Sequence, residues 1–387
     1  MCTRRYVLVV LTATLCLACA GSLRASESRP LADAMERGQS SMAKSDFNAS
    51  VSAYTEAIRL DPQSIAAHVG RGNAYRWKGE RDKAIADFTE AIRLDPKNPE
   101  LFVARSGAYL DKGDYTAAIA DYTAAILHDP KNAQLRVDRG RVWEYKGEYD
   151  KAVADFTEAI RLDPKCSRAY AARGEAYTVM GDNDKAIFDY SEAIQLDPKN
   201  PLHYGARGGR WEVKGEHDKA IADFTKGIRY YDSTKVSRFL DAEKRVGVRV
   251  AVVAVEQSTS EAGSVQITAN ENSDVGFGSW KAFAFAGRGG AWLSKKEYDK
   301  AIKDCTEAIR LDPSRADAYY NRGQAYLKTG DFDKAIADLT EAIRLYPKSG
   351  ASYYYRGLAY QKKGDTKKAK EDFAQAKKLG YEPGQNH

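Results

Sequence analysis

The sequence has few of the residues that catalytic and metal sites require. It contains five cysteines and five histidines in 387 residues, and none of them forms a CxxC pair or a cysteine–histidine cluster that would suit a metal ion. No histidine is spaced with a carboxylate or a cysteine as an activated nucleophile would need. After residue 20 the cysteines are Cys166 and Cys305, and two thiols in such different sequence settings do not make a disulfide framework. The sequence therefore predicts no enzyme, no cofactor and no metal site.

Charge of one sign is not in large excess either. Lysine and arginine number 60 against 54 aspartates and glutamates. The charges follow helical spacings that are typical of a solvated face, not of a surface that binds nucleic acid. We therefore expect no nucleic-acid partner.

The first 20 residues have the composition of an export signal. Two arginines precede an apolar run from Tyr6 to Ala20, which is short for a membrane span and ends in a small-x-small sequence, Ala18 to Ala20. One alternative is an uncleaved membrane anchor. Another is a lipoprotein signal with lipid on Cys19, although Cys16 stands where such signals have leucine. We expect contact with a membrane through this segment alone, in a protein that is periplasmic or secreted, or else a membrane-anchored lipoprotein.

One amphipathic stretch recurs through the chain. Residues 83–96 read KAIADFTEAIRLDP, and nearly the same letters return at 151–164 and 300–313. The apolar residues follow the i, i+3, i+4, i+7 spacing of one helix face. In the first copy they are Ala84, Ile85, Phe88, Ala91 and Ile92. Because a helix of this length is marginal alone in water, we expect the copies to pack on one another.

The stretch repeats with a fixed period. Its closing proline recurs every 34 residues from Pro62 to Pro198 and again from Pro313 to Pro347, and a turn glycine such as Gly79 lies halfway through most units. A second helical stretch precedes that glycine, so each unit is helix, turn, helix, loop. This pattern resembles the tetratricopeptide repeat (TPR) family. Counted from Ile65, the family's preferred residues fall on Gly72, Tyr75, Ala84, Phe88, Ala91 and Pro96.

The resemblance implies an all-α, right-handed superhelical solenoid of about nine 34-residue helix-turn-helix repeats. After a linker at 21–30, we expect repeats 1–6 at residues 31–234 and repeats 7–9 at 282–383. Between them lies a 47-residue insert, 235–281, for which we predict a short helix followed by a β-hairpin. Either repeat 7 stacks directly on repeat 6 with the insert looped out, or the array bends into two sub-arrays.

Two helix positions predict where the array ends. Positions 21 and 28, occupied by Ile85 and Ile92 in repeat 2, are isoleucine or valine in repeats 1–8 but Lys370 and Lys377 in repeat 9. These positions should face the following repeat, which repeat 9 lacks. The lysines therefore predict a polar C-terminal cap.

A second pattern is polar. Position 7, often leucine in the family, is arginine in every repeat, and position 23 is aspartate in eight of nine. Because arginine forks onto carboxylates, we predict a structural pair between Arg71 and Asp87 and between their counterparts. A row of arginines that binds anions is the alternative.

In the resembled family, positions 2, 5, 9 and 12 of the first helix line a concave groove that holds an extended or helical peptide. No repeat here has the lysine at position 5 with which some members clasp acidic chaperone tails, so that activity is not carried over. Tyrosine gives contact area with a polar tip, and we therefore predict that repeats 7–9 bind a protein segment. The candidate partner-binding residues are Asn73, Arg76, Arg141, Tyr320, Gln324, Leu327, Tyr354 and Leu358.

The sequence thus predicts an exported scaffold of the cell envelope that binds a protein or peptide segment through the concave face of its array. Two alternatives stay open. One is a homo-oligomer, a self-assembling structural envelope protein that pairs through the 235–281 insert. The other is an accessory domain that steers an enzyme complex.

Overall fold

The computed structural model describes residues 25–233 and 278–382, and every regular element in these ranges is an α-helix. These two ranges contain eighteen helices, as expected for nine hairpins. In chain order they are α1 (Ala25–Ala43), α2 (Phe47–Leu60), α3 (Ile65–Trp77), α4 (Arg81–Leu94), α5 (Pro99–Lys112), α6 (Tyr115–His128), α7 (Ala133–Tyr145), α8 (Tyr149–Leu162), α9 (Ser167–Val179), α10 (Asn183–Leu196), α11 (Pro201–Val213), α12 (His217–Ser233), α14 (Gly278–Ser294), α15 (Tyr298–Leu311), α16 (Ala316–Thr329), α17 (Phe332–Leu345), α18 (Gly350–Lys362) and α19 (Thr366–Lys378). The export signal and the β-hairpin predicted from the sequence lie outside the described residues.

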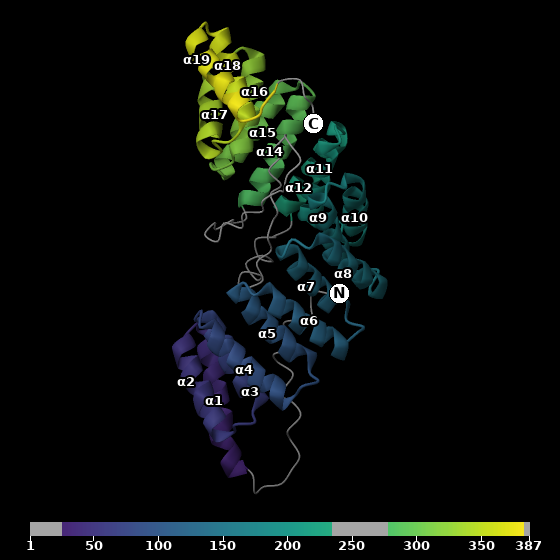
Figure 1. Ribbon diagram of the computed structural model, residues 1–387, viewed down its shortest axis with the longest axis vertical. Helices are drawn as coiled ribbons and strands as arrows, with labels where there is room; N and C mark the ends of the chain where they lie inside the picture. Colours follow the sequence, from purple (N-terminus) through teal and green to yellow (C-terminus); the bar gives the residue numbers. More distant parts are fainter. Residues whose placement is uncertain (1–24, 234–277, 383–387) are drawn as a thin grey trace. The chain divides into compact units, whose positions relative to one another are not determined.

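The chain divides into two compact units, residues 1–176 and 177–387. Within each unit, the first (A) helix of a repeat packs on the second (B) helix, and the B helix packs on the A helix of the next repeat (Figure 1). Several A helices also contact the A helix of the next repeat, as α1 does with α3 and α16 with α18. The described part of the chain is therefore an all-α helical repeat solenoid, and the A helices lie on its inner side.

Local sequence signals mark the beginning or the end of many helices. Asn98 caps α5 by accepting a hydrogen bond from the Glu100 amide, and Pro99 occupies the first helical turn. The turn glycine Gly79 has a φ of +78°, a left-handed conformation that glycine adopts without strain. Ser45 and Lys296 replace this glycine in repeats 1 and 7 and still adopt φ values of 59° and 62°. These two turns therefore carry backbone strain that the others lack.

The core of most repeats is built from small residues around one ring, which Cys305 and Leu339 replace in repeats 7 and 8. In repeat 2, Ala84, Phe88 and Ala91 are fully buried. A Cβ on Gly72 would lie 2.9 Å from the Phe88 ring, so this position allows the A helix to approach closely. The ring of Tyr75 is covered by the Lys83 ammonium at 5.4 Å, and this contact recurs between positions 11 and 19 of other repeats. Alanine and glycine thus set the short distance between the helices.

The array continues in register across the insert. Helix α14 packs on α12 as other A helices pack on the preceding B helix. Arg288 donates from Nη1 to Thr225 Oγ1 at 3.0 Å, a bond that spans 63 residues here and 16 elsewhere, which matches an insert of 47. Of the two sequence-based alternatives, direct stacking of repeat 7 on repeat 6 is therefore the one observed.

Two helices begin earlier than the repeat period predicts. Helix α1 starts at Ala25, so part of the predicted linker at 21–30 is helical. Helix α14 starts at Gly278, so the last residues of the predicted insert are helical as well. The second extension has a clear cause, because Trp280 is buried against Gly227 and stacks on Tyr231 with ring centroids 5.2 Å apart.

Candidate interaction surface

The arginine at position 7 ties each repeat together and joins it to the previous one. Arg71 donates from Nε and Nη2 to the two carboxylate oxygens of Asp87 at 2.9 and 2.7 Å, and from Nη1 to Thr55 Oγ1 of repeat 1 at 3.3 Å. Asp87 is buried, and its hydrogen bonds raise the pKa of Arg71. The same arrangement is present around Arg105, Arg139, Arg207, Arg288, Arg322 and Arg356.

These contacts favour the structural role of the arginines over an anion-binding row. A guanidinium that donates two hydrogen bonds to a buried carboxylate has its strongest donors occupied and its charge neutralised. Repeat 1 departs from the pattern because Ala53 stands at position 23, and Arg37 there pairs with Glu56 at 2.7 Å.

The side chains that face the inner side of the array are those at positions 2, 5, 9 and 12 of the A helices, which we call the inner stripe. In the first unit this stripe includes Asn73 and Arg76 in α3 and Arg141 and Glu144 in α7. All four are half-buried. The contacts that these side chains make with other side chains of the chain determine which groups the inner stripe presents to a ligand.

Two arginines of the inner stripe in the first unit, Arg76 and Arg141, have carboxylate partners in the chain itself. Arg76 donates from Nε to Asp111 at 2.7 Å. Arg141 donates from Nη1 to Glu144 at 3.0 Å and also to Glu175 in the next A helix. Sequence reasoning proposed Arg76 and Arg141 as partner-binding residues and missed Asp111 and Glu175. A partner with acidic side chains would have to compete with these internal carboxylates.

The two glutamates that share Arg141 have a distinctive electrostatic environment. Burial raises the pKa of Glu144 to about 7, and the nearby charge of Glu175 acts in the same direction, while Arg141 opposes both. Near neutral pH this carboxyl group is therefore close to half protonated.

In repeats 8 and 9 the inner stripe is aromatic where that of the first unit is charged, apart from Asp317, whose carboxylate pairs with Arg315. Tyr354 packs against Tyr355, Phe373 and Tyr381 with ring centroids 5.2–5.5 Å apart, and Tyr320 meets Tyr355 edge-on at 5.8 Å. Burial raises the pKa of Tyr320 well above its usual value and that of Tyr381 to about 12. Tyr381 lies beyond the last helix, so the repeat pattern gave no signal for it.

The other predicted partner-binding residues of the second unit lie beside this aromatic cluster. Gln324 and Leu327 follow Tyr320 along α16, and Leu358 follows Tyr354 along α18. All three are half-buried. Together with the two tyrosines they form an uncharged strip on neighbouring A helices.

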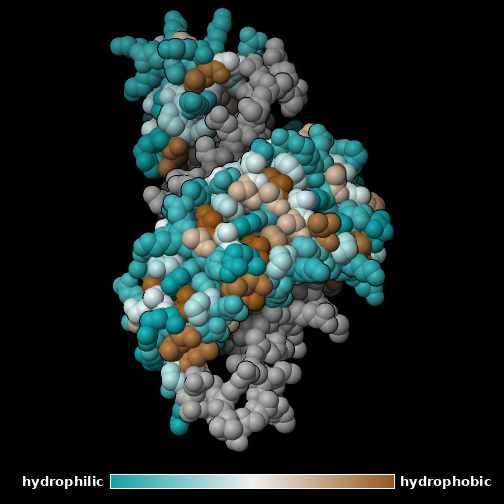
Figure 2. Space-filling view, turned by 60° about the horizontal axis from the view of Figure 1, so that its bottom comes forward, coloured by the Kyte–Doolittle hydropathy of each residue, from teal (hydrophilic) through white to brown (hydrophobic). Residues whose placement is uncertain are grey.

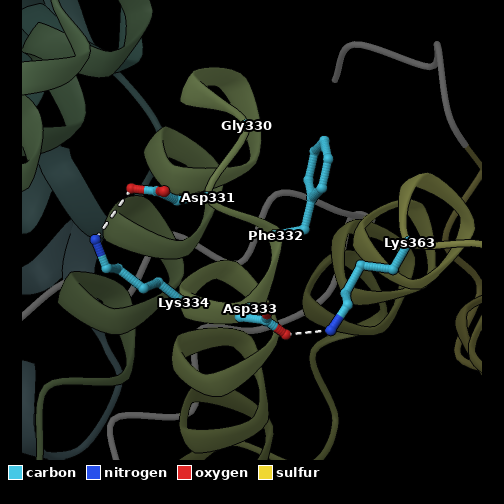
Figure 3. Close-up of a pocket in the computed structure, with 6 residues that line it drawn as sticks. All are labelled: Gly330, Asp331, Phe332, Asp333, Lys334 and Lys363. Atoms are coloured by element: carbon cyan, nitrogen blue, oxygen red, sulfur yellow. Dashed lines mark hydrogen bonds and ion pairs between the residues drawn. The ribbon is translucent and has the colours of Figure 1, made fainter.

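A shallow pocket opens on the turn side of repeats 8 and 9, away from the inner stripe. Its volume is about 220 Å³, and its wall is formed by Gly330, Asp331, Phe332, Asp333, Lys334 and Lys363. Asp331 accepts from Lys334 at 3.1 Å, and Asp333 accepts from Lys363 (Figure 3). Since its charges are paired with each other, the pocket presents little that would bind a charged small molecule.

The remaining described surface gives no sign of a metal site or a membrane span. In residues 25–233 and 278–382, no group of three or more histidine, cysteine, aspartate or glutamate side chains could hold a metal ion. No helix in the same ranges is long and apolar enough to cross a bilayer. On the face shown in Figure 2, hydrophobic residues lie in small groups between hydrophilic ones.

Comparison with known families identifies the repeats. Models described as tetratricopeptide repeat or TPR repeat match residues 65–98, 104–152, 167–200, 289–330, 316–349 and 351–379. The chain belongs to the tetratricopeptide repeat family. No curated protein matches it. As a TPR array, the chain is a scaffold for protein–protein interaction.

Several solved structures are similar to parts of this TPR protein. The APC/C hetero-tetramer Cut9–Hcn1 has a TM-score of 0.51 at 18% identity, over 81% of this chain and 52% of that one. A TPR protein from Parabacteroides merdae has a TM-score of 0.48 at 17% identity, over 77% and 99%. The MamA protein has a TM-score of 0.40 at 26% identity, over 44% and 94%.

Proposed function

We propose that this TPR protein is an exported scaffold that binds a segment of a partner protein along the inner stripe of repeats 8 and 9. The observation that carries the proposal is the difference in charge along the inner stripe. Arg76 and Arg141 of the first unit are occupied by the protein's own carboxylates. The strip of Tyr320, Gln324, Leu327, Tyr354 and Leu358 is uncharged and half-buried, so a ligand can cover it without separating ion pairs.

The chemistry of this strip indicates the kind of segment it would hold. Tyrosine and leucine provide apolar contact area, and the tyrosine hydroxyls and the Gln324 amide provide hydrogen bonds. Such a surface suits a segment with apolar side chains at regular spacing and backbone groups that can reach the amide. Because it lacks a charged anchor, we expect its partner to lack a cluster of acidic residues.

Export is the second part of the proposal, and it is supported by the sequence of residues 1–20. Cell fractionation of the full chain in a bacterial host, with Ala18→Arg and Ala20→Arg as the variant, tests it. We expect the parent protein in the envelope fraction with its leader removed and the variant membrane-bound at full length, because charged residues at the cleavage site block signal processing. Recovery of the parent protein from the cytoplasm would contradict export.

A crosslinking experiment tests the binding site. A photo-activatable residue placed at Gln324 should capture a partner in the native cell, and the additional substitution Leu358→Arg should abolish the captured species by adding an unpaired charge to the strip. The matched control places the same probe at Ala337, which is exposed on the outer helix α17. Capture of the same species from Ala337, or its persistence in the Leu358→Arg variant, would contradict the proposed site.

A further inference from the structure

Four junctions between repeats contain an ion pair, in addition to the hydrogen bond that the arginine at position 7 donates to the previous repeat. Lysine at position 14 of one repeat pairs with aspartate at position 18 of the repeat before it. Lys112 pairs with Asp82 at 2.7 Å, and Lys363 pairs with Asp333. The same pair joins Lys214 to Asp184 and Lys295 to Asp218. Position 18 therefore faces the following repeat, as positions 21 and 28 do.

The last helix, α19, has lysine at all three of these positions. Lys367, Lys370 and Lys377 are exposed, and Lys378 extends the same face. The four lysines lie within an arc of about 120° on the helix, and Glu371 is the acidic residue in that arc. Among the described residues, none of these four lysines has an ion-pair partner. We call them the lysine face.

The need to keep the exposed end of the array in water does not explain why these positions are lysine. A terminal repeat requires a polar outer surface, and neutral or acidic side chains would serve equally well. The N-terminal cap, helix α1, is mixed, with Asp33, Glu36 and Gln39 exposed on it. By contrast, residues 350–382 hold eight lysines and arginines against four acidic residues, whereas the whole chain holds 60 against 54.

The lysine face also opposes the addition of a second copy to the end of the array. A copy that stacked head-to-tail on α19 would bring its own position 14, Lys44, to Lys367. The incoming repeat would meet a like charge in place of the usual aspartate and would bury Lys370 and Lys377 without partners. Such a contact is unfavourable, so the occupant of this face must itself be anionic.

We propose that the lysine face of α19 binds the anionic surface of a lipid bilayer. Lysine ammonium groups are compact, strongly hydrated point charges that suit a diffuse layer of phosphate headgroups better than the forked geometry of a specific carboxylate site. The face is one helix wide and has neither the aromatic side chains that stack on bases nor a groove for a peptide. This surface is distinct from the inner stripe, so the proposal goes beyond the proposed function, and it adds a second membrane contact to the one that the sequence predicts for residues 1–20.

Vesicle binding tests the proposal on the full chain. Co-sedimentation is measured with vesicles of phosphatidylcholine alone and with vesicles that contain phosphatidylglycerol. The apolar leader contributes to both, so the difference between the two compositions reports the charge-dependent part. We expect tighter binding to the anionic vesicles, falling as salt is raised. Replacing all four lysines by glutamine should weaken this charge-dependent binding by several hundredfold, since each lysine near an anionic surface contributes roughly fivefold.

The matched control removes the same charge elsewhere. Glutamine at Lys97, Lys131, Lys165 and Lys199 changes four exposed lysines of separate loops and should leave vesicle binding within about twofold of the parent protein, because dispersed charges do not reach one surface together. Circular dichroism verifies that both variants keep their helices. Equal losses in the two variants, or no loss in the α19 variant, would overturn the proposal. So would binding to polyglutamate without binding to anionic vesicles, which would assign the face to an acidic polypeptide.

Discussion

The inner stripes of the two units carry different chemistry on one set of helix positions. In the first unit, position 9 carries Arg141 and Glu175, which neutralise each other across consecutive A helices. In the second unit, positions 5 of α16 and α18 carry Tyr320 and Tyr354, which meet through Tyr355. The backbone framework is the same in both, because the position 7 arginines hold it. Recognition can therefore differ between the units without a change of fold.

The largest effect should follow from removal of the charge that holds the first stripe together. Arg141→Ala leaves Glu144 and Glu175 facing each other on a half-buried surface, and we expect a loss of about 2–3 kcal/mol in local stability near pH 8. Hydrogen exchange of the α7 amides measures the loss. Adding Glu144→Gln and Glu175→Gln should restore most of it, and an Arg141→Ala variant with unchanged exchange in α7 would show that the ion pairs do not matter.

A comparable test of the second stripe is truncation of its central ring. Tyr354→Ala removes contacts with three aromatic rings and should cost about 2 kcal/mol, since the ring is half-buried. Exchange should accelerate in α18 and α19. Tyr354→Phe keeps the packing and should cost less than about 0.5 kcal/mol. If the phenylalanine variant is as unstable as the alanine variant, the hydroxyl and not the ring holds the cluster.

The repeat period made the framework predictable and left the two stripes undetermined. Arg71 and Asp87 recur with fixed spacing in almost every repeat, so their pairing could be inferred from the sequence. The contact between Arg141 and Glu175 occurs at one junction, and it depends on how closely two A helices approach, which the period does not encode. Tyr381 lies outside the repeats, and its place against the Tyr354 ring follows from a chain reversal at Gly380, where φ is +81°.

The starts of α1 and α14 cannot be read from the repeat period for a similar reason. The repeat boundary gives the shortest helix that completes a unit, and helices extend beyond it where side chains find a packing site. Trp280 finds one in the second unit, because a Cβ on Gly205 would lie only 3.0 Å from its Nε1. The glycine and the tryptophan are far apart in the sequence, so their contact could not be read from the 34-residue pattern.

The pH dependence of stability should separate the two units. Glu144 has its pKa raised to about 7 in the folded protein, against about 4.3 in an unfolded chain. The folded state therefore holds a proton that the unfolded state releases, and the contribution to stability is present at low pH and lost as pH rises through about 7. Arg141, Glu175, Tyr145 and Tyr149 are the titratable neighbours that interact with this carboxyl group.

We expect the first unit to lose about 1–2 kcal/mol between pH 5 and pH 8 and the Glu144→Gln variant to lose less. Exchange of the α7 amides, corrected for the intrinsic effect of pH, measures the loss. The tyrosines of the second unit have raised pKa values, that of Tyr381 being about 12, so their contribution is retained up to about pH 10 and lost above it. Equal pH dependence of α7 and α18 in the neutral range would remove this difference between the units.

The smallest expected effect concerns two strained turns, one in each unit, which can be compared directly. Ser45 in the first unit and Lys296 in the second adopt positive φ where the other repeats have glycine. Replacing either residue by glycine should stabilise its own hairpin by about 1 kcal/mol, because the left-handed conformation strains any side chain with a Cβ. Thermal unfolding and hydrogen exchange of the adjoining helices measure the gain, and Gly79→Ala serves as the reverse control, with an expected loss of about 1 kcal/mol. A gain at Lys296 without one at Ser45 would mean that repeat 1, the first of the described repeats, already unfolds locally at this turn. Strain in a segment that is open does not contribute to the stability of the rest.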